Sequence, residues 1–498
     1  MPTLSKTRFI EGLQCVKRLY LSTYRKDLAQ YGEDDLASFD AGIKIGDLAT
    51  RLFPGGVRVD VDQSQLGLGL EKTRDILSDD SVPAIFEAVL ENGGVLVRAD
   101  ILERVSGKEW KIVEVKASTG VKDQHYPDAA IQVHVARGAG LAVRSADLMH
   151  INNRYVYDGR NLDLSSLFAR SSVTDEVESW QERLPAMLAG QFDVLAGPEP
   201  AVEPGSQCSS PYGCPFWNHC TEGKPRRWIY YLPRLGEELQ ADLRSRGVES
   251  IEAIPDDVPL TDLQRRARDC VRSGDPYVAP ALKREIGIER YPVHYLDFET
   301  INPAIPRFAG TRPYQQVPFQ WSVLTVRAKG GTAEEHAYLH QDSQDPRRGL
   351  AEKLLEALRE PGPVYVYNRG FEAGVLRGLA DHLPDLAPGL LDIEARLVDL
   401  LPPIRSPYYH ADLDGSFSLK AVVPTLLPEM SYAGLDVGDG LQAGIAYLKM
   451  ITPDCPPDER DRLRRALLTY CGRDTMALRM VHEKLLAVCD TRMRATSF

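Results

Sequence analysis

Several features that mark other classes of protein are absent from this chain or scarce in it. No stretch approaches the roughly 20 apolar residues that a membrane-spanning helix needs. The first residues, Met-Pro-Thr-Leu-Ser-Lys, lack the apolar core of a secretory signal peptide. The chain has 8 cysteines in 498 residues, which is too sparse for a secreted disulfide scaffold. These absences predict a cytoplasmic protein that does not enter a membrane.

The chain also lacks an excess of positive charge and a nucleotide-phosphate motif. Its formal net charge of -12 argues against a generally basic coat for nucleic acid. Local clusters of lysine and arginine remain, and they either line a binding groove or form a solvated face. The pattern Gly-x4-Gly-Lys-Ser/Thr does not occur, so unwinding a duplex would need a helicase or another repair or defence partner.

The length of 498 residues is too great for one ordinary core, and a content of 43% hydrophobic residues is typical of a folded protein. The pattern predicts an α/β protein with a first domain over residues 1–228, a small helical connector over 229–290 and a second domain over 291–498. Strands are expected at 84–90, 95–102, 110–115, 148–151, 293–299, 318–327, 334–339 and 363–367, and helices at 4–28, 40–53, 126–140, 174–191, 348–359, 370–382 and 457–487.

Two acids and a lysine on neighbouring predicted strands form the first candidate site. Asp100 ends an apolar strand, and Glu114 and Lys116 alternate on the next strand, so they point to the same face of the sheet. Hydrolysis of a phosphodiester needs a divalent metal ion to activate water. The two carboxylates would hold that ion, and the lysine would orient water or stabilise developing charge. Gln132, on the following helix, either faces this site or serves as a helix cap or surface residue.

Four of the cysteines form a second pattern. Cys15 lies near the N-terminus, whereas Cys208, Cys214 and Cys220 follow much later, with five residues between neighbours. Thiolates hold either zinc or an iron–sulfur cluster. Structural zinc sites usually contain two Cys-x2-Cys pairs, which this set lacks, so its spacing favours an iron–sulfur cluster that joins the start of the first domain to its end.

Together these residues resemble the RecB-type branch of the PD-(D/E)xK nuclease superfamily, which includes CRISPR-adaptation exonucleases and AddB-like helicase–nucleases. The resemblance covers about residues 4–225. It implies a restriction-endonuclease-like fold with a [4Fe-4S] cluster on the four cysteines. It also implies that Asp100 and Glu114 are metal ligands, that Lys116 is the catalytic lysine, and that Gln132 is the glutamine of the motif.

A second set of acids is spread over the predicted second domain. Asp297 and Glu299 lie two residues apart at the end of an apolar strand, so they share one face and could bridge two metal ions. Glu372 follows another predicted strand. Tyr470 and Asp474 lie one helical turn apart on the final helix, where the tyrosine could orient the attacking water.

In this order the residues resemble the tyrosine-bearing DEDD exonucleases of the ribonuclease H-like fold, with Glu372 where that group usually has aspartate. The resemblance covers about residues 291–490 and implies a 3′–5′ exonuclease that uses Mg2+ or Mn2+. Lys420, in a Ser-Leu-Lys segment, matches a substrate contact of that group. Almost the whole chain, including residues 312–322, is also similar to an uncharacterised bacterial group, the domain-of-unknown-function 2779 family.

The expected function is therefore that of a metal-dependent nuclease with two nuclease-type domains, in which the C-terminal exonuclease site is favoured for activity. Single-stranded DNA is the favoured substrate because the first resemblance is to DNA-processing enzymes, and RNA is the second choice. The alternative is a catalytically weak or inactive protein whose iron–sulfur domain grips nucleic acid ends. A third option is a defence nuclease that acts on foreign or tRNA-like substrates.

Overall fold

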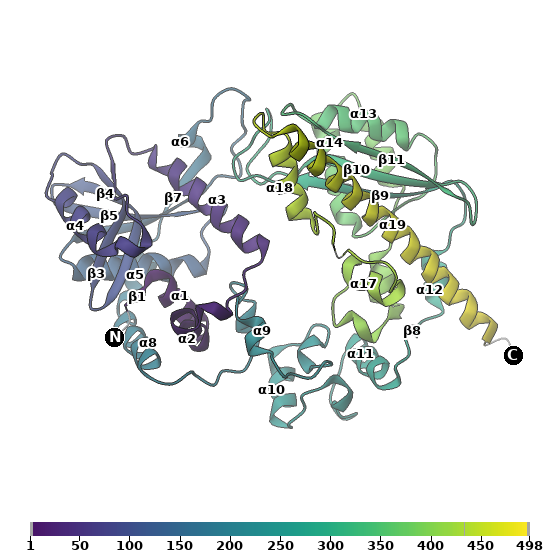
Figure 1. Cartoon of the computed structure of the whole chain (residues 1–498), viewed down its shortest axis with the longest axis horizontal. Coiled ribbons are helices and arrows are strands. Elements are labelled where there is room, and N and C mark those ends of the chain that lie inside the picture. The colour runs from purple at the N-terminus through teal and green to yellow at the C-terminus, as the bar shows by residue number, and fades with distance from the viewer. Residues whose placement is uncertain (1–2, 433, 496–498) are drawn as a thin grey trace. The chain divides into compact units, whose positions relative to one another are not determined.

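A computed structural model describes residues 3–432 and 434–495 of the chain and shows a mixed α/β protein. The chain folds into two compact units (Figure 1). Unit 1 comprises Met1–Gly223 and Ala304–Tyr314, and unit 2 comprises Lys224–Pro303 and Gln315–Phe498. The expected connector, 229–290, lies within unit 2. In the described ranges, no helix combines the length and the apolar character needed to cross a membrane.

Unit 1 is built on a seven-stranded sheet of order β2-β3-β4-β5-β6-β7, with β1 paired to β4. Three pairs are antiparallel (β3–β4, β4–β5 and β6–β7), and three are parallel (β1–β4, β2–β3 and β5–β6). The strands are β1 (Leu4–Ser5), β2 (Val57–Arg58), β3 (Ala84–Asn92), β4 (Val95–Ser106), β5 (Glu109–Lys116), β6 (Ala142–Ile151) and β7 (Phe168–Ser172).

Helices cover both faces of this sheet. The helices of unit 1 are α1 (Lys6–Gln14), α2 (Val16–Tyr24), α3 (Glu33–Thr50), α4 (Leu66–Leu77), α5 (Tyr126–Gly138), α6 (Leu164–Leu167), α7 (Thr174–Gln181), α8 (Leu184–Ala196) and α9 (Trp217–Cys220). Ile112 of β5 packs in one core with residues of α1, α4 and α5, whereas Val113 packs in a second core with residues of α3. Because strand side chains alternate, Glu114 shares the face of Ile112 and points toward α5.

A short segment that follows β9 in the sequence, residues 304–314, belongs to unit 1. Ile305 and Tyr314 pack against the core that contains Val113. The hydroxyl of Tyr314 donates a hydrogen bond to the carbonyl of Ala117, the residue after Lys116 at the end of β5. This segment therefore supports the strand that carries the first candidate site.

Unit 2 contains a five-stranded sheet of order β11-β10-β9-β12-β13. In this sheet β10 is antiparallel to both β9 and β11. β12 pairs in parallel with β9, and β13 pairs in parallel with β12. The strands are β9 (Val293–Ile301), β10 (Val317–Val326), β11 (Ala333–Leu339), β12 (Val364–Val366) and β13 (Leu397–Asp399); a separate pair joins β8 (Tyr277–Val278) to β14 (Tyr408–Tyr409).

Alternation along β9 divides its side chains between two helical layers. Leu296 and Phe298 pack in one core with α13, α14 and α15, while Tyr295 contacts His482 of α19 on the other face, along which α19 runs (Figure 1). The helices of unit 2 are α10 (Glu237–Ser245), α11 (Asp262–Ser273), α12 (Ala281–Ile286), α13 (Arg347–Ala357), α14 (Arg369–His382), α15 (Ala387–Ala395), α16 (Leu401–Arg405), α17 (Leu419–Leu426), α18 (Gly440–Met450) and α19 (Pro457–Ala495).

The strands expected from the sequence are present, but three helix expectations were wrong in detail. The helix expected over 4–28 is interrupted at Cys15, which has extended backbone between α1 and α2. The helix expected at 40–53 is α3, which already begins at Glu33. The helix expected at 174–191 is two helices, because Pro185 lies at the start of α8 and cannot continue a preceding helix.

Candidate functional sites

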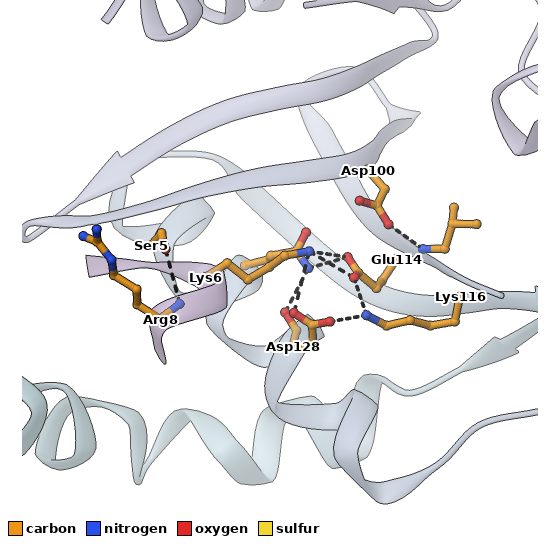
Figure 2. A network of polar contacts seen from close by, with 9 residues as sticks. Ser5, Lys6, Arg8, Asp100, Glu114, Lys116 and Asp128 are labelled. Atoms are coloured by element: carbon orange, nitrogen blue, oxygen red, sulfur yellow. Dashed lines mark hydrogen bonds and ion pairs between the residues drawn. The ribbon is translucent and has the colours of Figure 1, made fainter. Parts of the chain in front are cut away.

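The first site lies where β4, β5 and α5 meet in unit 1 (Figure 2). Asp100 accepts a hydrogen bond of 2.8 Å from the backbone N–H of Val115. Glu114 is 2% exposed, and its carboxylate accepts from the amide of Gln132 and, at 2.8 Å, from Lys116. The structure thus brings together Asp100, Glu114, Lys116 and Gln132, which the sequence analysis had selected.

Lys6 and Asp128 complete this site, and the sequence analysis had not assigned either of them to it. The ammonium of Lys6 lies 3.0 and 3.2 Å from the two carboxylate oxygens of Glu114 and 3.6 Å from Asp128. Lys116 also contacts Asp128, so both lysines bridge the same two acids (Figure 2). Lys6 is fixed at the start of α1, where Ser5 caps the helix by accepting from the N–H of Arg8.

The two ammonium groups largely offset the negative charge of this site. Burial, and then the nearby charge of Glu114, raise the pKa of Asp100 to about 7. Burial opposes ionisation of Glu114 as well, but Lys116 and Lys6 outweigh it and hold the pKa of Glu114 well below its usual range. Glu114 is therefore an ionised carboxylate that already has two cationic partners.

The second site lies between β9, the start of α14 and the middle of α19 in unit 2. Asp297 and Glu299 occupy one face of β9, as their spacing predicted. Glu372 lies in the first turn of α14, close enough for the charge of Asp297 to act on it. Asp474 lies on α19 near Asp297, and the charges of Asp474, Glu299 and Asp297 all act on the nearby hydroxyl of Tyr470. The predicted residues Asp297, Glu299, Glu372, Tyr470 and Asp474 thus gather in one place.

The acids of this second site repel one another. Burial, followed by the charge of Asp474, raises the pKa of Asp297 well above its usual range. Burial, followed by Asp297, does the same for Glu299 and raises the pKa of Glu372 to about 9. Glu372 is 2% exposed, and its Oε2 atom has no hydrogen-bond partner. Within the described residues, none of these acids takes part in an ion pair, in contrast to Glu114.

Three further side chains border the second site. The ammonium of Lys420 lies 5.2 Å from the ring centre of Tyr470 and 5.8 Å from that of Tyr432, and its charge favours ionisation of Asp297 and Asp474. Lys420 had been expected as a substrate contact from its segment, whereas Tyr432 had not been selected. Cys471, which the sequence analysis had not assigned to any site, places its sulfur 3.6 Å from Asp297 Oδ2.

The ligand atoms of Asp297, Glu299 and Cys471 lie within 4.8 Å of one another. Among the described residues, no other group of three or more His, Cys, Asp or Glu side chains has this spacing. The chain thus contains a group of two acids and a cysteine that has the spacing of metal ligands, and it lies at the second site. Carboxylate oxygens are ligands that Mg2+ and Mn2+ accept.

The four cysteines expected to hold a cluster are Cys15, Cys208, Cys214 and Cys220, and none of them is in a disulfide. Burial raises the pKa of Cys220 to about 11, and the other three cysteines add to the shift. The start of the chain is tied to the cysteine-rich loop by hydrogen bonds. Gln14 donates at 2.6 and 2.7 Å to the carbonyls of Gln207 and Tyr212. The structure therefore gathers the four cysteines in one region of unit 1.

Comparison with known proteins gave one family match. A family described as "Domain of unknown function (DUF2779)" matches residues 294–418, a range that starts on β9 and contains Asp297, Glu299 and Glu372 but ends before Lys420. The match makes this part of unit 2 similar to that family. A search of curated proteins found no match.

Replacing Glu372 by Gln should flatten the pH dependence of stability in the metal-free protein. The pKa of Glu372 is about 9 in the folded chain against an ordinary value of 4.5. Its contribution to stability is therefore fully present below pH 4.5 and is lost as the pH rises to about 9. Urea unfolding in EDTA between about pH 5 and 9 measures this slope. The exposed Glu335→Gln is the control, and a wild-type slope in Glu372→Gln would contradict the assignment.

Replacing Lys6 by Ala should destabilise unit 1 by about 2–3 kcal/mol, because it removes one partner of a buried carboxylate. The loss stays below the largest values for buried pairs because Glu114 keeps Lys116 and because the Lys6 side chain is 19% exposed. Calorimetric unfolding of the full chain measures the change. Lys108→Ala, in the exposed turn between β4 and β5, is the control, and equal stability of the two variants would rule out a supporting role for Lys6.

Proposed function

We propose that unit 2 is a metal-dependent 3′–5′ exonuclease that acts on single-stranded nucleic acid, with DNA favoured over RNA. The arrangement of the acids in the second site is the observation that supports this proposal most strongly. Several buried acids there face one another with no ion pair among the described residues, and Glu372 Oε2 has no partner. Buried acids in this state bind either protons or cations. A nuclease of this kind uses the cations for chemistry.

The oxygen donors of the second site suit Mg2+ or Mn2+. Asp297 and Glu299 from β9, Glu372 from α14 and Asp474 from α19 would hold the metal. When bound, the metal would screen the charge that develops on phosphorus and lower the pKa of water. The sheet order of unit 2, with three antiparallel strands followed by two parallel ones, supports the ribonuclease H-like assignment.

Two side chains beside these acids have roles that need no metal contact. The hydroxyl of Tyr470 lies beside Asp474, Glu299 and Asp297, where it would orient the attacking water. Burial and these acids raise its pKa far above the usual range, so Tyr470 remains a phenol that donates a hydrogen bond. Lys420 provides a positive charge next to Tyr470 and would contact a phosphate of the substrate.

The first site resembles a nuclease centre in its residues, but its charge is arranged differently. Lys6 and Lys116 both contact Glu114 and Asp128, so its acids depend less on an added cation. We assign catalysis mainly to unit 2 and propose that unit 1 binds or guides nucleic acid, with cleavage by Lys116 and its neighbours as a slower activity. A helicase or another repair or defence factor would supply duplex unwinding.

The cysteine set fits a [4Fe-4S] cluster better than a single zinc ion. One zinc ion, at about 2.3 Å from each sulfur, requires sulfurs within about 4 Å of one another. In the described chain, no three of the four cysteines have ligand atoms within 4.8 Å of one another. The cluster would hold Cys15 against the loop of Cys208, Cys214 and Cys220, and its role would be structural.

The exonuclease proposal predicts a ladder of products shortened from the 3′ end. Protein purified without oxygen would be incubated with Mn2+ and 5′-labelled single-stranded DNA or RNA. Asp297→Asn should reduce the rate by more than about 100-fold, since loss of even an outer-shell partner of a metal costs 10–100-fold. Lys116→Ala should leave the ladder in place.

Asp436→Asn provides a matched control, because Asp436 is an exposed acid of unit 2 that pairs with Arg462 at 2.6 Å. It should retain wild-type activity. Loss of cleavage in Lys116→Ala with cleavage retained in Asp297→Asn would move the activity to unit 1. Binding without cleavage by the wild type and by every variant would instead identify an inactive nucleic-acid-binding protein.

The cluster proposal predicts a brown protein with about four irons per chain after anaerobic purification. Cys15→Ala should lose iron and colour and should lower the stability of unit 1. Cys270→Ala, which changes a buried cysteine of unit 2, should keep both. A colourless preparation that contains one zinc ion per chain would contradict the cluster.

A further inference from the structure

Cys471 places a soft sulfur atom beside the acids of the second site, whose oxygens are hard donors. It lies on α19 between Tyr470 and Asp474, on the face that meets β9, and it is fully buried. Its thiol donates to Asp297, with the sulfur 3.6 Å from Oδ2 and 3.9 Å from the backbone oxygen. A catalytic site for Mg2+ alone would gain nothing from a thiol, because Mg2+ prefers oxygen ligands.

The distance between Cys471 and Asp297 is compatible with two ligands of one zinc ion. Ligands at about 2.1 Å (oxygen) and 2.3 Å (sulfur) from one zinc ion, at a tetrahedral angle, lie about 3.6 Å apart. The distance from Cys471 Sγ to Asp297 Oδ2 is 3.6 Å. Glu299 completes a group whose ligand atoms all lie within 4.8 Å, and the unpartnered oxygen of Glu372 lies close by.

We propose that Asp297, Glu299 and Cys471 form a binding site for a thiophilic divalent cation such as Zn2+. On binding, the Cys471 thiol would release its proton to solvent and its sulfur would bond to the metal. Thiolate ligands select zinc over magnesium and manganese, so the site binds Zn2+ in preference to the cations that support hydrolysis. A tetrahedral ion held through sulfur would occupy the place of a catalytic cation and stop the nuclease.

The inhibition rests on the exonuclease proposed above, whereas the metal site does not, and the two are tested separately. Co2+ serves as the probe for the site, because a cobalt–thiolate bond absorbs in the near-ultraviolet. Spectra of the full-length protein before and after addition of Co2+ are subtracted, which cancels the absorption of any iron–sulfur cluster. The wild type should show the charge-transfer band, and Zn2+ should abolish it.

Three variants decide the assignment. Cys471→Ser should lose the cobalt band and bind Zn2+ at least about tenfold more weakly, since the loss of outer-shell partners alone costs 10–100-fold. Asp297→Asn keeps the thiol and should also weaken Co2+ binding. Cys489→Ser, which alters another buried cysteine of α19, should behave as wild type. A band that persists in Cys471→Ser, or is absent from the wild type, would overturn the proposed site.

The second measurement is nuclease activity at a fixed Mg2+ concentration with increasing Zn2+. The concentration of Zn2+ that halves the wild-type rate should rise about tenfold or more in Cys471→Ser. Equal sensitivity of the two proteins would overturn the inhibitory role. If the wild type cleaves nothing while the cobalt band follows Cys471, the exonuclease proposal fails and the metal site stands.

Discussion

Mutual repulsion among buried carboxylates is the constraint on which the second site depends. Asp297 and Glu299 point the same way from β9 because they lie two residues apart on a strand, and α14 and α19 add Glu372 and Asp474 to the same space. Burial disfavours the ionised form of each carboxyl group, and each ionised carboxylate disfavours ionisation of its neighbours. The folded chain relieves this repulsion by binding protons in the absence of metal, or by binding cations, and cations are what phosphodiester hydrolysis requires.

In the first site, lysine side chains of the protein itself offset the repulsion among the acids. Lys6 and Lys116 each lie close to Glu114, so this carboxylate stays ionised without an added ion. A site that contains its own cations gains less from binding metal than a site that contains none. The two sites therefore differ in how strongly they should bind a metal ion, and that difference is the reason why we propose unit 2 as the catalytic unit.

Much of both sites could be predicted from local periodicity alone. Asp297 and Glu299 follow from the two-residue repeat of a strand, and Tyr470 and Asp474 from the turn of a helix. Lys6 could not be predicted, because its partner lies 108 residues away in the sequence and only the tertiary fold brings them together. The same holds for Cys471, whose contact with Asp297 spans 174 residues. The placement of residues 304–314 in unit 1 also depends on packing that no local pattern reveals.

The position of Lys6 beside Glu114 depends on how α1 is anchored at its two ends. Lys6 is the first residue of α1, and Cys15 follows its last residue. A helix of 9 residues is a rigid rod of about 13 Å, so its two ends move together. Its far end is held by the bonds from Gln14 to the carbonyls of Gln207 and Tyr212. Its near end is held by the pairing of β1 with β4 and by the buried side chain of Phe9. The contacts of Lys6 with Glu114 therefore depend on packing at both ends of α1.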